Sequence, residues 1–479
     1  MTRSLLRGQD TQAQRAREGA FAAFLRRWPG YASPLLDADR RDDFARLDRH
    51  GDVYLDYTGA GLYPESLVRG HAERLLSGTF GNPHSTNPTS RAATELVEAA
   101  RGAVLSHVRA DPEEYVVVFT PNASGALKLV AESFPFGPGG TYLLTYDNHN
   151  SVNGIREFAR ARGADVVYAP VRPPELRIDE QGLRSALDAA PTGAPRLFAF
   201  PAQSNFSGVL HPLSWVAQAQ ERGWTVLLDA AAFAPTHALD LRAVRPDFVS
   251  LSFYKMFGYP TGVGALIARR EALAALRRPW FAGGTIAYAA VSQPRHDLHE
   301  GFEAFEDGTL NFLALSAITD GLALLGRRQA AIDARATALT AWTLERLLAL
   351  RHASGRPVVH VYGPPDVEAR GSSMAFNVHD ARGALVDHRE VEQRANAARI
   401  SLRTGCFCNP GAGEVALGIS GEELAGCFAH HDRMTVDAFR SCLTGKGSGA
   451  VRVSFGWAST FGDAHALVAL VASFADEPG

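Results

Sequence analysis

The stretch Val249-Ser-Leu-Ser-Phe-Tyr-Lys255 ends a short apolar run in a lysine, and the earlier stretch Val226-Leu-Leu-Asp229 ends in an aspartate. Both runs are typical of buried strands that lead into loops. A lysine amine can hold pyridoxal 5'-phosphate (PLP) as a Schiff base, and a carboxylate can keep the pyridine nitrogen protonated so that the ring accepts electrons. Each residue alone is more typical of an ordinary strand end that faces solvent. The pair therefore predicts a PLP site only in combination with its surroundings.

The composition is that of a globular protein and excludes several classes of partner. The chain has 479 residues, of which 46% are hydrophobic and 21% are charged, and its net charge is −3. This balance gives no electrostatic basis for binding nucleic acid or an anionic membrane. No apolar run approaches the roughly 20 residues that span a bilayer, so we expect no membrane association.

The N-terminal segment and the cysteines indicate a compartment. Residues Met1 to Arg27 are rich in Ala, Gln, Glu and Arg, which predicts an amphipathic leading helix. The segment lacks the apolar core of a secretory signal. Four cysteines, all after residue 400, are too few and too clustered for a secreted disulfide scaffold of this size. We therefore expect a cytoplasmic, reducing location.

From about residue 115 to residue 267, short β-branched runs alternate with helical stretches. The alternation predicts an α/β fold with a mostly parallel sheet that helices cover on both faces. Ligands of such sheets bind at the carboxyl ends of the strands, where Asp229 and Lys255 would lie. The predicted strands are Tyr115–Phe119, Tyr142–Thr145, Val166–Tyr168, Leu197–Phe200, Val226–Leu228, Phe248–Leu251 and Gly264–Ile267. The predicted helices include Ala126–Ser133, Gly154–Arg162, Leu183–Ala189 and Pro212–Arg222.

A second, smaller unit is predicted to follow. A long helical segment, from about Leu310 to Leu350, leads into three further strand-like runs. These runs are Val358–Tyr362, Ser373–Val378 and Val451–Phe455. The predicted division is an N-terminal segment that packs with the small domain (1–60), a large PLP-binding domain (61–330) and a small C-terminal domain that carries a cysteine loop (331–479).

Three polar turns follow predicted strands of the large domain. The turn Phe119-Thr-Pro-Asn-Ala-Ser124 leads into a helix, whose first N–H groups, at Ala123 and Ser124, favour an anion such as a phosphate. Taken alone, the turn better fits an ordinary helix start in which Ser124 caps its own helix. His149 has the chemistry to stack on a pyridine ring and to move protons, although a lone histidine is more often a surface residue. Asn205 suits a ring hydroxyl or a substrate carboxylate, and its sequence equally fits a plain turn.

Two cysteines lie in the Gly/Pro-rich loop Arg403-Thr-Gly-Cys406-Phe-Cys408-Asn-Pro-Gly411. A neighbouring cation favours the reactive thiolate form. A structural zinc site would need four ligands with wider cysteine spacing, and this loop has only C-x-C. The other potential ligands, at Cys427, Cys442, His430 and His431, are distant in sequence. The sequence therefore gives only weak support for a zinc site. The other alternative, that the two cysteines are buried and unreactive, does not fit a polar loop well.

Arg452 lies within the apolar alternating run Gly449-Ala-Val-Arg452-Val-Ser-Phe455. A buried guanidinium requires an anionic partner, and no acidic residue stands beside it in the sequence. A substrate α-carboxylate would satisfy it with two hydrogen bonds. The alternative is an ion pair with an Asp or Glu that is distant in sequence.

Six short segments of the sequence are more informative together than separately. They are Gly81-Asn-Pro-His-Ser, Phe200-Pro-Ala-Gln-Ser-Asn-Phe-Ser-Gly, Ser252-Phe-Tyr-Lys-Met-Phe-Gly-Tyr-Pro-Thr-Gly-Val-Gly, Phe305-Glu-Asp-Gly-Thr309, Leu402-Arg-Thr-Gly-Cys-Phe-Cys-Asn and Arg452-Val-Ser-Phe-Gly. In this order they resemble the PLP-dependent class V aminotransferases, and among these the cysteine desulfurases and the N-terminal, desulfurase-like domain of molybdenum cofactor sulfurases. The resemblance runs from about residue 52 to the end. It implies PLP fold type I, with a large, mostly parallel sheet domain and a smaller α+β domain.

The resemblance implies a role for each side chain around the cofactor. Lys255 looks like the residue that forms the Schiff base, and Asp229 like the partner of the ring nitrogen. His149 looks like the residue that stacks on the ring, and Asn205 like the residue beside the ring hydroxyl and the substrate. The phosphate would be bound by Ala123, Ser124 and Ser252.

The resemblance also implies residues for the substrate and for a second subunit. Arg452, together with Arg403, fits the clamp on a substrate carboxylate. Cys408 matches the sulfur-accepting nucleophile, and Cys406 lies where that pattern varies. Thr309 is similar to the residue that reaches a partner subunit's phosphate, which implies a homodimer.

The implied reaction takes sulfur from L-cysteine, or from a related amino acid, to a Cys408 persulfide and releases alanine. A sulfur acceptor, either a protein or a small molecule, would follow. Many desulfurases have a glutamine where this chain has Ala232, so the ring-hydroxyl contact falls to Asn205, and Tyr254 stands where a histidine often precedes the lysine. The sequence ends without the C-terminal domain with which the sulfurases bind the molybdenum cofactor, which leaves the recipient open.

Two alternatives remain. The first is a PLP-dependent lyase, epimerase or cyclising enzyme of a biosynthetic pathway that transfers no sulfur, because one fold hosts many reactions. The second is a non-catalytic sulfur carrier or scaffold, against which Lys255, Asp229 and Arg452 count together. Cys408 separates the desulfurase from the lyase, because only the desulfurase needs its thiol.

Overall fold

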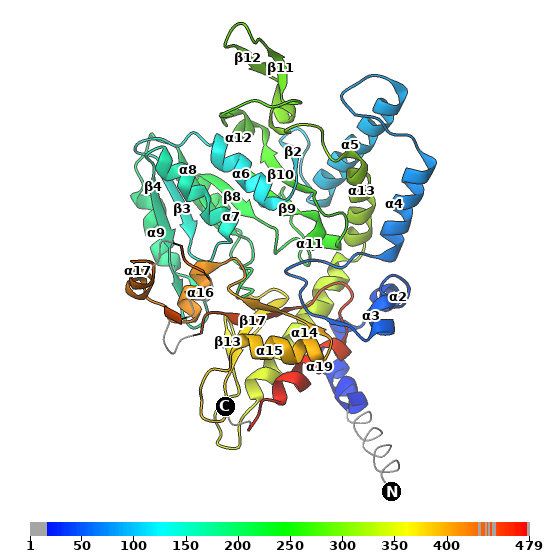
Figure 1. Cartoon of the computed structure of the whole chain (residues 1–479), viewed down its shortest axis with the longest axis vertical. Coiled ribbons are helices and arrows are strands. Elements are labelled where there is room, and N and C mark those ends of the chain that lie inside the picture. The colour runs from blue at the N-terminus through cyan, green and yellow to red at the C-terminus, as the bar shows by residue number, and fades with distance from the viewer. Residues whose placement is uncertain (1–16, 430–432, 436–437, 439–440, 443–446, 477–479) are drawn as a thin grey trace.

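The structure is a computed structural model that describes residues 17–429, 433–435, 438, 441–442 and 447–476. Figure 1 shows a large layered domain above a smaller one. The expected leading helix lies partly outside the described residues, and residues 17–27 are helical. The first elements after it are η1 (Pro29–Tyr31), α2 (Pro34–Asp42), α3 (Ala45–His50), β1 (Val53–Tyr54) and α4 (Glu65–Ser77).

The large domain is built on a seven-stranded sheet with the order β2-β10-β9-β8-β7-β3-β4. The strands are β2 (Tyr115–Thr120), β3 (Thr141–Thr145), β4 (Asp165–Ala169), β7 (Arg196–Pro201), β8 (Thr225–Asp229), β9 (Phe248–Ser252) and β10 (Gly264–Arg269). The pairs from β4 to β9 are parallel, whereas β10 is antiparallel to both β9 and β2. The α/β class with a mostly parallel sheet is therefore confirmed.

Helices cover both faces of this sheet, as the continuous apolar strands require. Val117 packs into one apolar cluster, and its neighbours Val116 and Val118 pack into another on the opposite face. The principal covering helices are α5 (Pro88–His107), α6 (Ala123–Ser133), α8 (Ile155–Ala161), α9 (Glu180–Ala189), α10 (Trp215–Gln220) and α13 (Phe312–Gly326). Shorter elements are α7 (Asn150–Asn153), β5 (Val171–Arg172), β6 (Arg177–Ile178), α12 (Arg270–Ala274) and η2 (Gly301–Phe305).

Two predicted elements differ from the structure. The single helical segment expected over 310–350 is divided into α13 and α14 (Gln329–Ala349), and the chain turns where Arg328 donates to both oxygens of Asp39, at 2.6 and 2.7 Å. The lysine expected at a strand end instead lies one turn later. Strand β9 ends at Ser252, and Lys255 belongs to the short helix α11 (Phe253–Phe257).

Helix α11 is short because a glycine in a left-handed conformation ends it. Gly258 follows it with φ +76°, a conformation that costs glycine little. A Cβ atom at this position would overlap the backbone of Leu62 and Tyr63. The chain around residue 61 therefore packs directly on the lysine helix, and it limits the space around Lys255.

The small domain holds a four-stranded antiparallel sheet with the order β13-β14-β17-β16. Its elements are β13 (Val359–Tyr362), β14 (Ser373–Val378), α15 (His388–Ala397), β15 (Ile400–Ser401), β16 (Arg403–Gly405), α16 (Pro410–Ala416), β17 (Ala450–Ser454) and α19 (Phe461–Ala472). Phe24, Tyr31 and Leu55 pack into its apolar core, whereas Leu36 and Phe44 pack into the core of the large domain. Division of the chain near residues 60 and 330 stays a prediction.

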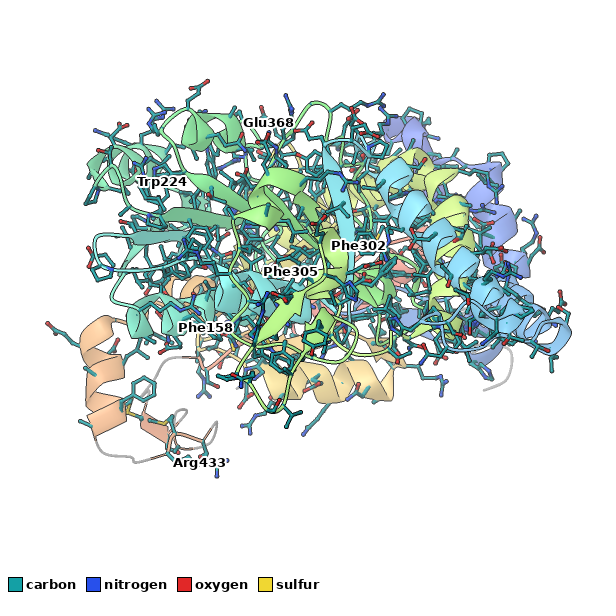
Figure 2. The ribbon with its side chains drawn as sticks, turned by 90° about the horizontal axis from the view of Figure 1, so that it is seen from above. Phe158, Trp224, Phe302, Phe305, Glu368 and Arg433 are labelled. Atoms are coloured by element: carbon teal, nitrogen blue, oxygen red, sulfur yellow. A yellow bond between two sulfur atoms is a disulfide. The ribbon has the colours of Figure 1, made fainter. Side chains whose placement is uncertain are left out.

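Two features project from the main body. The hairpin of β11 (Ile286–Ala289) and β12 (His296–Leu298) stands out at the top of Figure 1. Helix α17 (Gly421–Ala429) carries Cys427, which forms a disulfide with Cys442 (Figure 2). Such a bridge is unusual in the reducing compartment that the cysteine count favoured, and the compartment stays a prediction.

The disulfide also bears on the weakly supported zinc site, because Cys427 and Cys442 are engaged with each other. His430 and His431 lie outside the described residues. In the described part of the chain, no three His, Cys, Asp or Glu side chains are grouped closely enough to hold a metal ion. Among the described helices, none is both long and apolar enough to cross a membrane.

Candidate active site

A cavity of about 150 Å³ lies at the carboxyl ends of β7, β8 and β9 and beside the start of α6. It brings together residues that were predicted from the sequence and that span more than 130 positions of the chain. Its lining residues are Asn122, Ala123, Ser124, Leu127, His149, Ser151, Pro201, Gln203, Asn205, Asp229, Ala231, Ala232, Ser252, Tyr254 and Lys255. The cavity is where a mostly parallel sheet is expected to bind a ligand.

Asp229 presents one fixed and one open carboxylate oxygen. Its Oδ1 accepts hydrogen bonds from the Ser250 hydroxyl at 2.9 Å and from the Ala231 N–H at 3.1 Å. Its Oδ2 has no donor among the described residues. The carboxylate is therefore oriented by the sheet, with an acceptor left for a donor in the cavity.

Lys255 projects into the same cavity from α11, and its amine has no hydrogen-bond or ion-pair partner in the described part of the chain. Burial lowers the pKa of Lys255 below its ordinary value, and the negative charge of Asp229 opposes that shift. Cys408 opposes that shift as well. A lowered pKa raises the uncharged fraction of the amine, the form that attacks a carbonyl.

The start of α6 forms an anion-binding corner of the cavity. The Asn122 side chain caps the helix by accepting from the Gly125 N–H at 2.9 Å, and the Ala123 N–H donates to the Ser252 hydroxyl at 2.8 Å. The Ser124 hydroxyl lies 2.6 Å from the Ser151 hydroxyl. Helix N–H groups and several hydroxyls thus converge where a phosphate would be stabilised.

His149 is held as a neutral ring. Its Nδ1 accepts a hydrogen bond from the Ser151 N–H at 3.1 Å, so the histidine caps the short helix α7. Burial lowers the pKa of His149, although the charge of Asp229 opposes this. An uncharged imidazole beside Lys255 avoids repelling a protonated amine and remains able to accept a proton.

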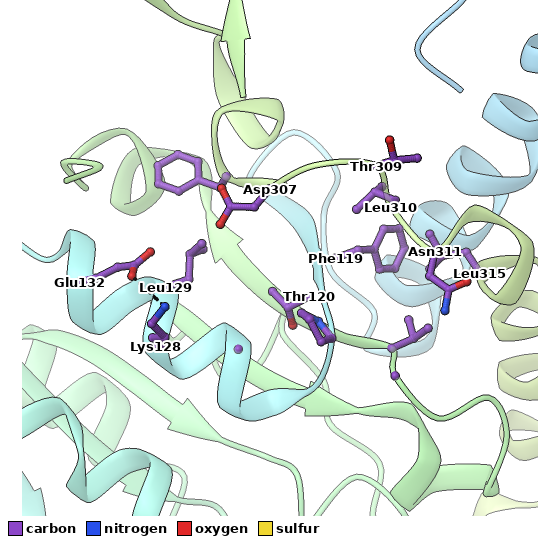
Figure 3. Close-up of a pocket in the computed structure, with 15 residues that line it drawn as sticks. Phe119, Thr120, Lys128, Leu129, Glu132, Asp307, Thr309, Leu310, Asn311 and Leu315 are labelled. Carbon is purple, nitrogen blue, oxygen red and sulfur yellow. Dashed lines mark ion pairs between the residues drawn. The ribbon is translucent and has the colours of Figure 1, made fainter. Parts of the chain in front are cut away.

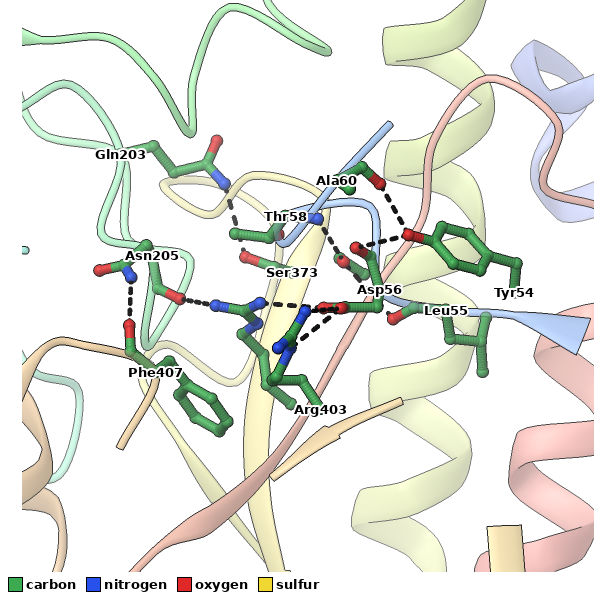
Figure 4. A network of polar contacts seen from close by, with 12 residues as sticks. Tyr54, Leu55, Asp56, Thr58, Ala60, Gln203, Asn205, Ser373, Arg403 and Phe407 are labelled. Carbon is green, nitrogen blue, oxygen red and sulfur yellow. Dashed lines mark hydrogen bonds and ion pairs between the residues drawn. The ribbon is translucent and has the colours of Figure 1, made fainter. Parts of the chain in front are cut away.

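Arg452 and Arg403 share one carboxylate (Figure 4). Arg452 donates to Asp56 Oδ1 at 3.0 Å, and Arg403 donates to Asp56 Oδ2 at 2.6 Å. Arg452 also donates to the Asn205 carbonyl at 2.8 Å, while its buried Nε has no partner in the described residues. An acid distant in sequence is therefore a partner of Arg452, and the two guanidiniums together still carry one positive charge in excess.

The cysteine loop joins β16 to α16, and it contacts the cavity through Asn205, a lining residue whose amide donates to the Phe407 carbonyl at 2.7 Å. Cys406 and Cys408 are both free and exposed. Phe407 and Cys408 adopt left-handed backbone conformations, with φ +55° and +56°. For residues with a side chain, such conformations cost about 1–3 kcal/mol each, so the surroundings must hold them. The backbone of Cys408 is held by the Asn150 N–H, which donates to its carbonyl at 2.7 Å.

Thr309 does not lie in this cavity. It lines a separate cavity of about 460 Å³ on the other side of α6, together with Phe119, Lys128 and Leu310 (Figure 3). Its hydroxyl accepts a hydrogen bond from the Asn82 amide at 3.3 Å. Any contact between Thr309 and a phosphate would therefore require a second copy of the chain.

Sequence reasoning missed several residues of the site, notably Asp56, Ser151 and Asn409. Asp56 follows the apolar run Val53-Tyr-Leu, so it shows the same strand-end pattern that drew attention to Asp229. Ser151 lies two positions after His149, but a serine in a polar turn carries no specific signal. Asn409 lies in the quoted cysteine loop, and its contacts are apparent only in the structure.

The chain is similar to known proteins over most of its length. A model of the aminotransferase class-V family matches residues 53–467. A molybdenum cofactor sulfurase from Bos taurus is 38% identical over 469 residues, an alignment that covers 92% of this chain and 52% of that protein. The chain spans about half the length of the curated relatives it matches.

Solved structures show the same fold at lower identity. A cysteine desulfurase from Thermococcus onnurineus NA1 has a TM-score of 0.75 and 23% identity, and the match covers 91% of this chain and 97% of that one. The cystine C-S lyase C-DES, in complex with its reaction product cysteine persulfide, has a TM-score of 0.66 and 19% identity, with 88% and 98% coverage.

Proposed function

The chain belongs to the aminotransferase class-V family, whose cofactor is PLP and whose fold is PLP fold type I, and we propose that it is a cysteine desulfurase. The observation that carries this proposal is the place of Cys408. Its thiol is exposed, and its loop is bonded to the wall of the Lys255 cavity: Asn205, which lines the cavity, donates to the Phe407 carbonyl at 2.7 Å, and the Asn150 N–H donates to the Cys408 carbonyl at 2.7 Å. A PLP enzyme that transfers no sulfur has no need of a thiol in this position.

The lining of the cavity fits PLP. The open oxygen of Asp229 suits a protonated pyridine nitrogen, and the unpaired amine of Lys255 suits an aldehyde carbon. The hydroxyls at the start of α6, from Ser124 and Ser252, suit a phosphate. His149 offers a neutral, flat ring for stacking. When bound, PLP supplies an electron sink for bonds at the α- and β-carbons of an amino acid.

The two arginines suit the α-carboxylate of the substrate. Because Asp56 balances only one of the two positive charges, a second anion is favoured beside Arg452 and Arg403. Asn205 adjoins the same place, since its carbonyl accepts from Arg452 and its side chain lines the cavity. These contacts would orient free L-cysteine with its thiol toward the cysteine loop.

The sulfur moves from L-cysteine to Cys408 by a displacement at the substrate sulfur. The Cys408 thiolate attacks the substrate sulfur, an S–S bond forms, and the C–S bond breaks with its electron pair left on the substrate carbon. A proton from Lys255 or His149 completes the methyl group of alanine. Cys408 keeps the sulfur as a persulfide, and its exposure leaves that sulfur accessible to an acceptor protein or small molecule.

The test is to incubate the PLP-loaded protein with L-cysteine and to measure alanine together with the mass of the Cys408 peptide. We expect alanine and a persulfide in the wild type, and a loss of at least about 100-fold in alanine release for Cys408→Ala, because the nucleophile is absent. Cys406→Ser is the matched control and should stay within about threefold. Bound cofactor without any alanine would contradict the proposal.

A C-S lyase, epimerase or cyclising enzyme is the second candidate, and the shared fold of a cystine C-S lyase favours keeping it. The same variants separate the two functions. A lyase would keep most of its activity in Cys408→Ala, and it would leave no added sulfur on the Cys408 peptide.

We also propose a homodimer in which Thr309 approaches the phosphate of the other copy. Its support is the position of Thr309 in a cavity that Phe119, Leu310 and Leu315 line in part, and the exposed Trp280, Tyr288 and Val291 on and below the projecting hairpin. Sedimentation should give twice the chain mass, and Thr309→Ala should weaken PLP binding several-fold. A monomer with full PLP affinity would contradict this arrangement.

A further inference from the structure

The cysteine loop is tied to the large domain by four hydrogen bonds. The Asn150 N–H donates to the Cys408 carbonyl at 2.7 Å, and the Asn205 amide donates to the Phe407 carbonyl at 2.7 Å. Asn409 supplies the other two bonds from its side-chain amide, to the Asp147 carbonyl at 2.6 Å and to Asn205 Oδ1 at 2.9 Å. Both amide hydrogens of Asn409 are thus used, and the residue is completely buried.

Asn409 also has a separate, local role in its own segment. Its Oδ1 accepts from the Ala412 N–H at 3.2 Å, which caps α16, and its backbone N–H donates to the Cys406 carbonyl at 2.9 Å. These bonds stay within the loop and the helix that follows. The oxygen of the side chain therefore serves the local fold, while the nitrogen serves the contact between domains, and the two roles can be separated by substitution.

The helix behind the loop is docked just as closely. A Cβ atom at Gly411 would overlap the Tyr146 carbonyl, and the Tyr146 hydroxyl donates to Glu414 at 2.7 Å. The left-handed residues Phe407 and Cys408 thus lie between β16, which pairs with β17, and the docked helix α16. The direction of the Cys408 side chain depends on those attachments, because its own backbone preference does not supply it.

We propose that Asn409 is a positioning residue that fixes Cys408 beside the Lys255 cavity by donating both amide hydrogens to the large domain. This inference rests on the proposed desulfurase function and assigns its geometry. The sulfur is taken up and given away at one place, so an acceptor must reach the loop where it stands. The loop therefore does not need to move away from the cavity to deliver the sulfur of its persulfide.

The test uses Asn409→Ser, which keeps an oxygen to cap α16 and removes both amide donors. Hydrogen–deuterium exchange of the peptide covering 405–411, measured without PLP, should become at least about tenfold faster. In the PLP-loaded enzyme, kcat for alanine release should fall about 10- to 100-fold with KM for L-cysteine within twofold, because a displacement of about 1 Å costs up to 10²-fold in rate. The control Asp179→Ser changes the cap of α9, at the far edge of the sheet, and should alter neither quantity.

The outcomes separate this inference from the proposed function. Exchange and kcat both within twofold of the wild type would overturn the role of Asn409. If the wild-type protein releases no alanine, the proposed desulfurase function is wrong. The hydrogen–deuterium exchange measurement would still decide whether Asn409 holds the loop. Asn409→Asp, which also keeps the cap and loses the donors, is measured in parallel. Failure of both variants to unfold cooperatively would make Asn409 a stability residue and overturn the proposal.

Discussion

The two walls of the active site are built in different ways. The cofactor wall is formed by the ends of neighbouring strands of one sheet and by the start of helix α6. Three of its residues, Asp229, Ser252 and Lys255, lie within a short stretch of the chain. The opposite wall joins Asp56 to Arg452, which are 396 positions apart, and adds the cysteine loop. A wall made of consecutive strand ends depends on one sheet. The opposite wall depends on the packing of the N-terminal segment against the small domain and on the docking of the cysteine loop to the large domain.

The walls also differ in how their charges are compensated. On the cofactor wall the Lys255 amine has no partner in the described chain, and Asp229 is the main group that opposes its loss of charge. On the opposite wall Asp56 forms direct ion pairs with two guanidiniums, one of them buried. Substitutions on the cofactor wall should therefore affect chemistry more than stability, and substitutions at Asp56 should do the reverse.

The largest effect is expected for Lys255→Ala. Turnover should fall by more than about 10³-fold, because the residue both holds the cofactor and moves a proton. The free energy of unfolding of the PLP-free protein should stay within about 1 kcal/mol of the wild type, because no described partner of the amine is left unpaired. Alanine release and urea unfolding measure the two quantities. Turnover within tenfold of the wild type would refute the assignment of Lys255.

Asp56→Ala should show the opposite pattern. It leaves the buried Arg452 uncompensated, which costs about 3–5 kcal/mol of unfolding free energy. PLP affinity should change by less than about threefold, because Asp56 is not in the lining of the cofactor cavity.

The control is Asp52→Ala, which removes an exposed ion pair with Arg399 and should cost less than about 1 kcal/mol. Urea unfolding of the two variants without PLP gives the comparison. Equal losses for Asp56→Ala and Asp52→Ala would mean that the opposite wall is not held by its buried charges.

The difference between the walls also explains what the sequence could predict. Asp229 and Lys255 each follow an apolar run, and runs of this kind mark strand ends whose carboxyl edges converge on a ligand site. The alternation of strands and helices predicted all seven strands of the large sheet. Lys255 itself was misplaced by one turn, because the tight approach of residues 61–63 to Gly258 is a tertiary contact.

The opposite wall could not be assembled from local patterns. Arg452 was recognised as a buried cation, but its partner Asp56 lies in the N-terminal segment, which meets Arg452 only where that segment packs against the strands of the small domain. The disulfide between Cys427 and Cys442 was missed for a related reason, since cysteine number and spacing do not specify pairing. Asn409 gave no signal, because a buried asparagine and a turn asparagine look alike in sequence.

The pH dependence of cofactor uptake tests the electrostatics of both walls. Only the uncharged amine reacts, and burial lowers the pKa of Lys255, so the rate of PLP uptake should rise about tenfold per pH unit and level off below pH 10.5. Asp229 and, more weakly, Asp56 oppose that shift. Asp229→Asn should therefore move the midpoint to lower pH, and Asp56→Asn should move it less. Absorbance changes after mixing PLP with the PLP-free protein report the rate, and an upward move in either variant would contradict the scheme.

Ser151→Ala should have the smallest effect and would define the edge of the cofactor wall. The Ser151 hydroxyl lies 2.6 Å from that of Ser124, so its removal takes one hydrogen-bonding group from the phosphate corner. A hydrogen bond of this kind contributes about 0.5–1.5 kcal/mol, which corresponds to a roughly 2- to 12-fold weaker affinity for PLP. Ser106→Ala, on the exposed side of α5, is the control and should leave the affinity unchanged. Equal affinities in the two variants, measured by equilibrium titration, would place the phosphate away from α7 and narrow the cofactor wall to α6 and Ser252.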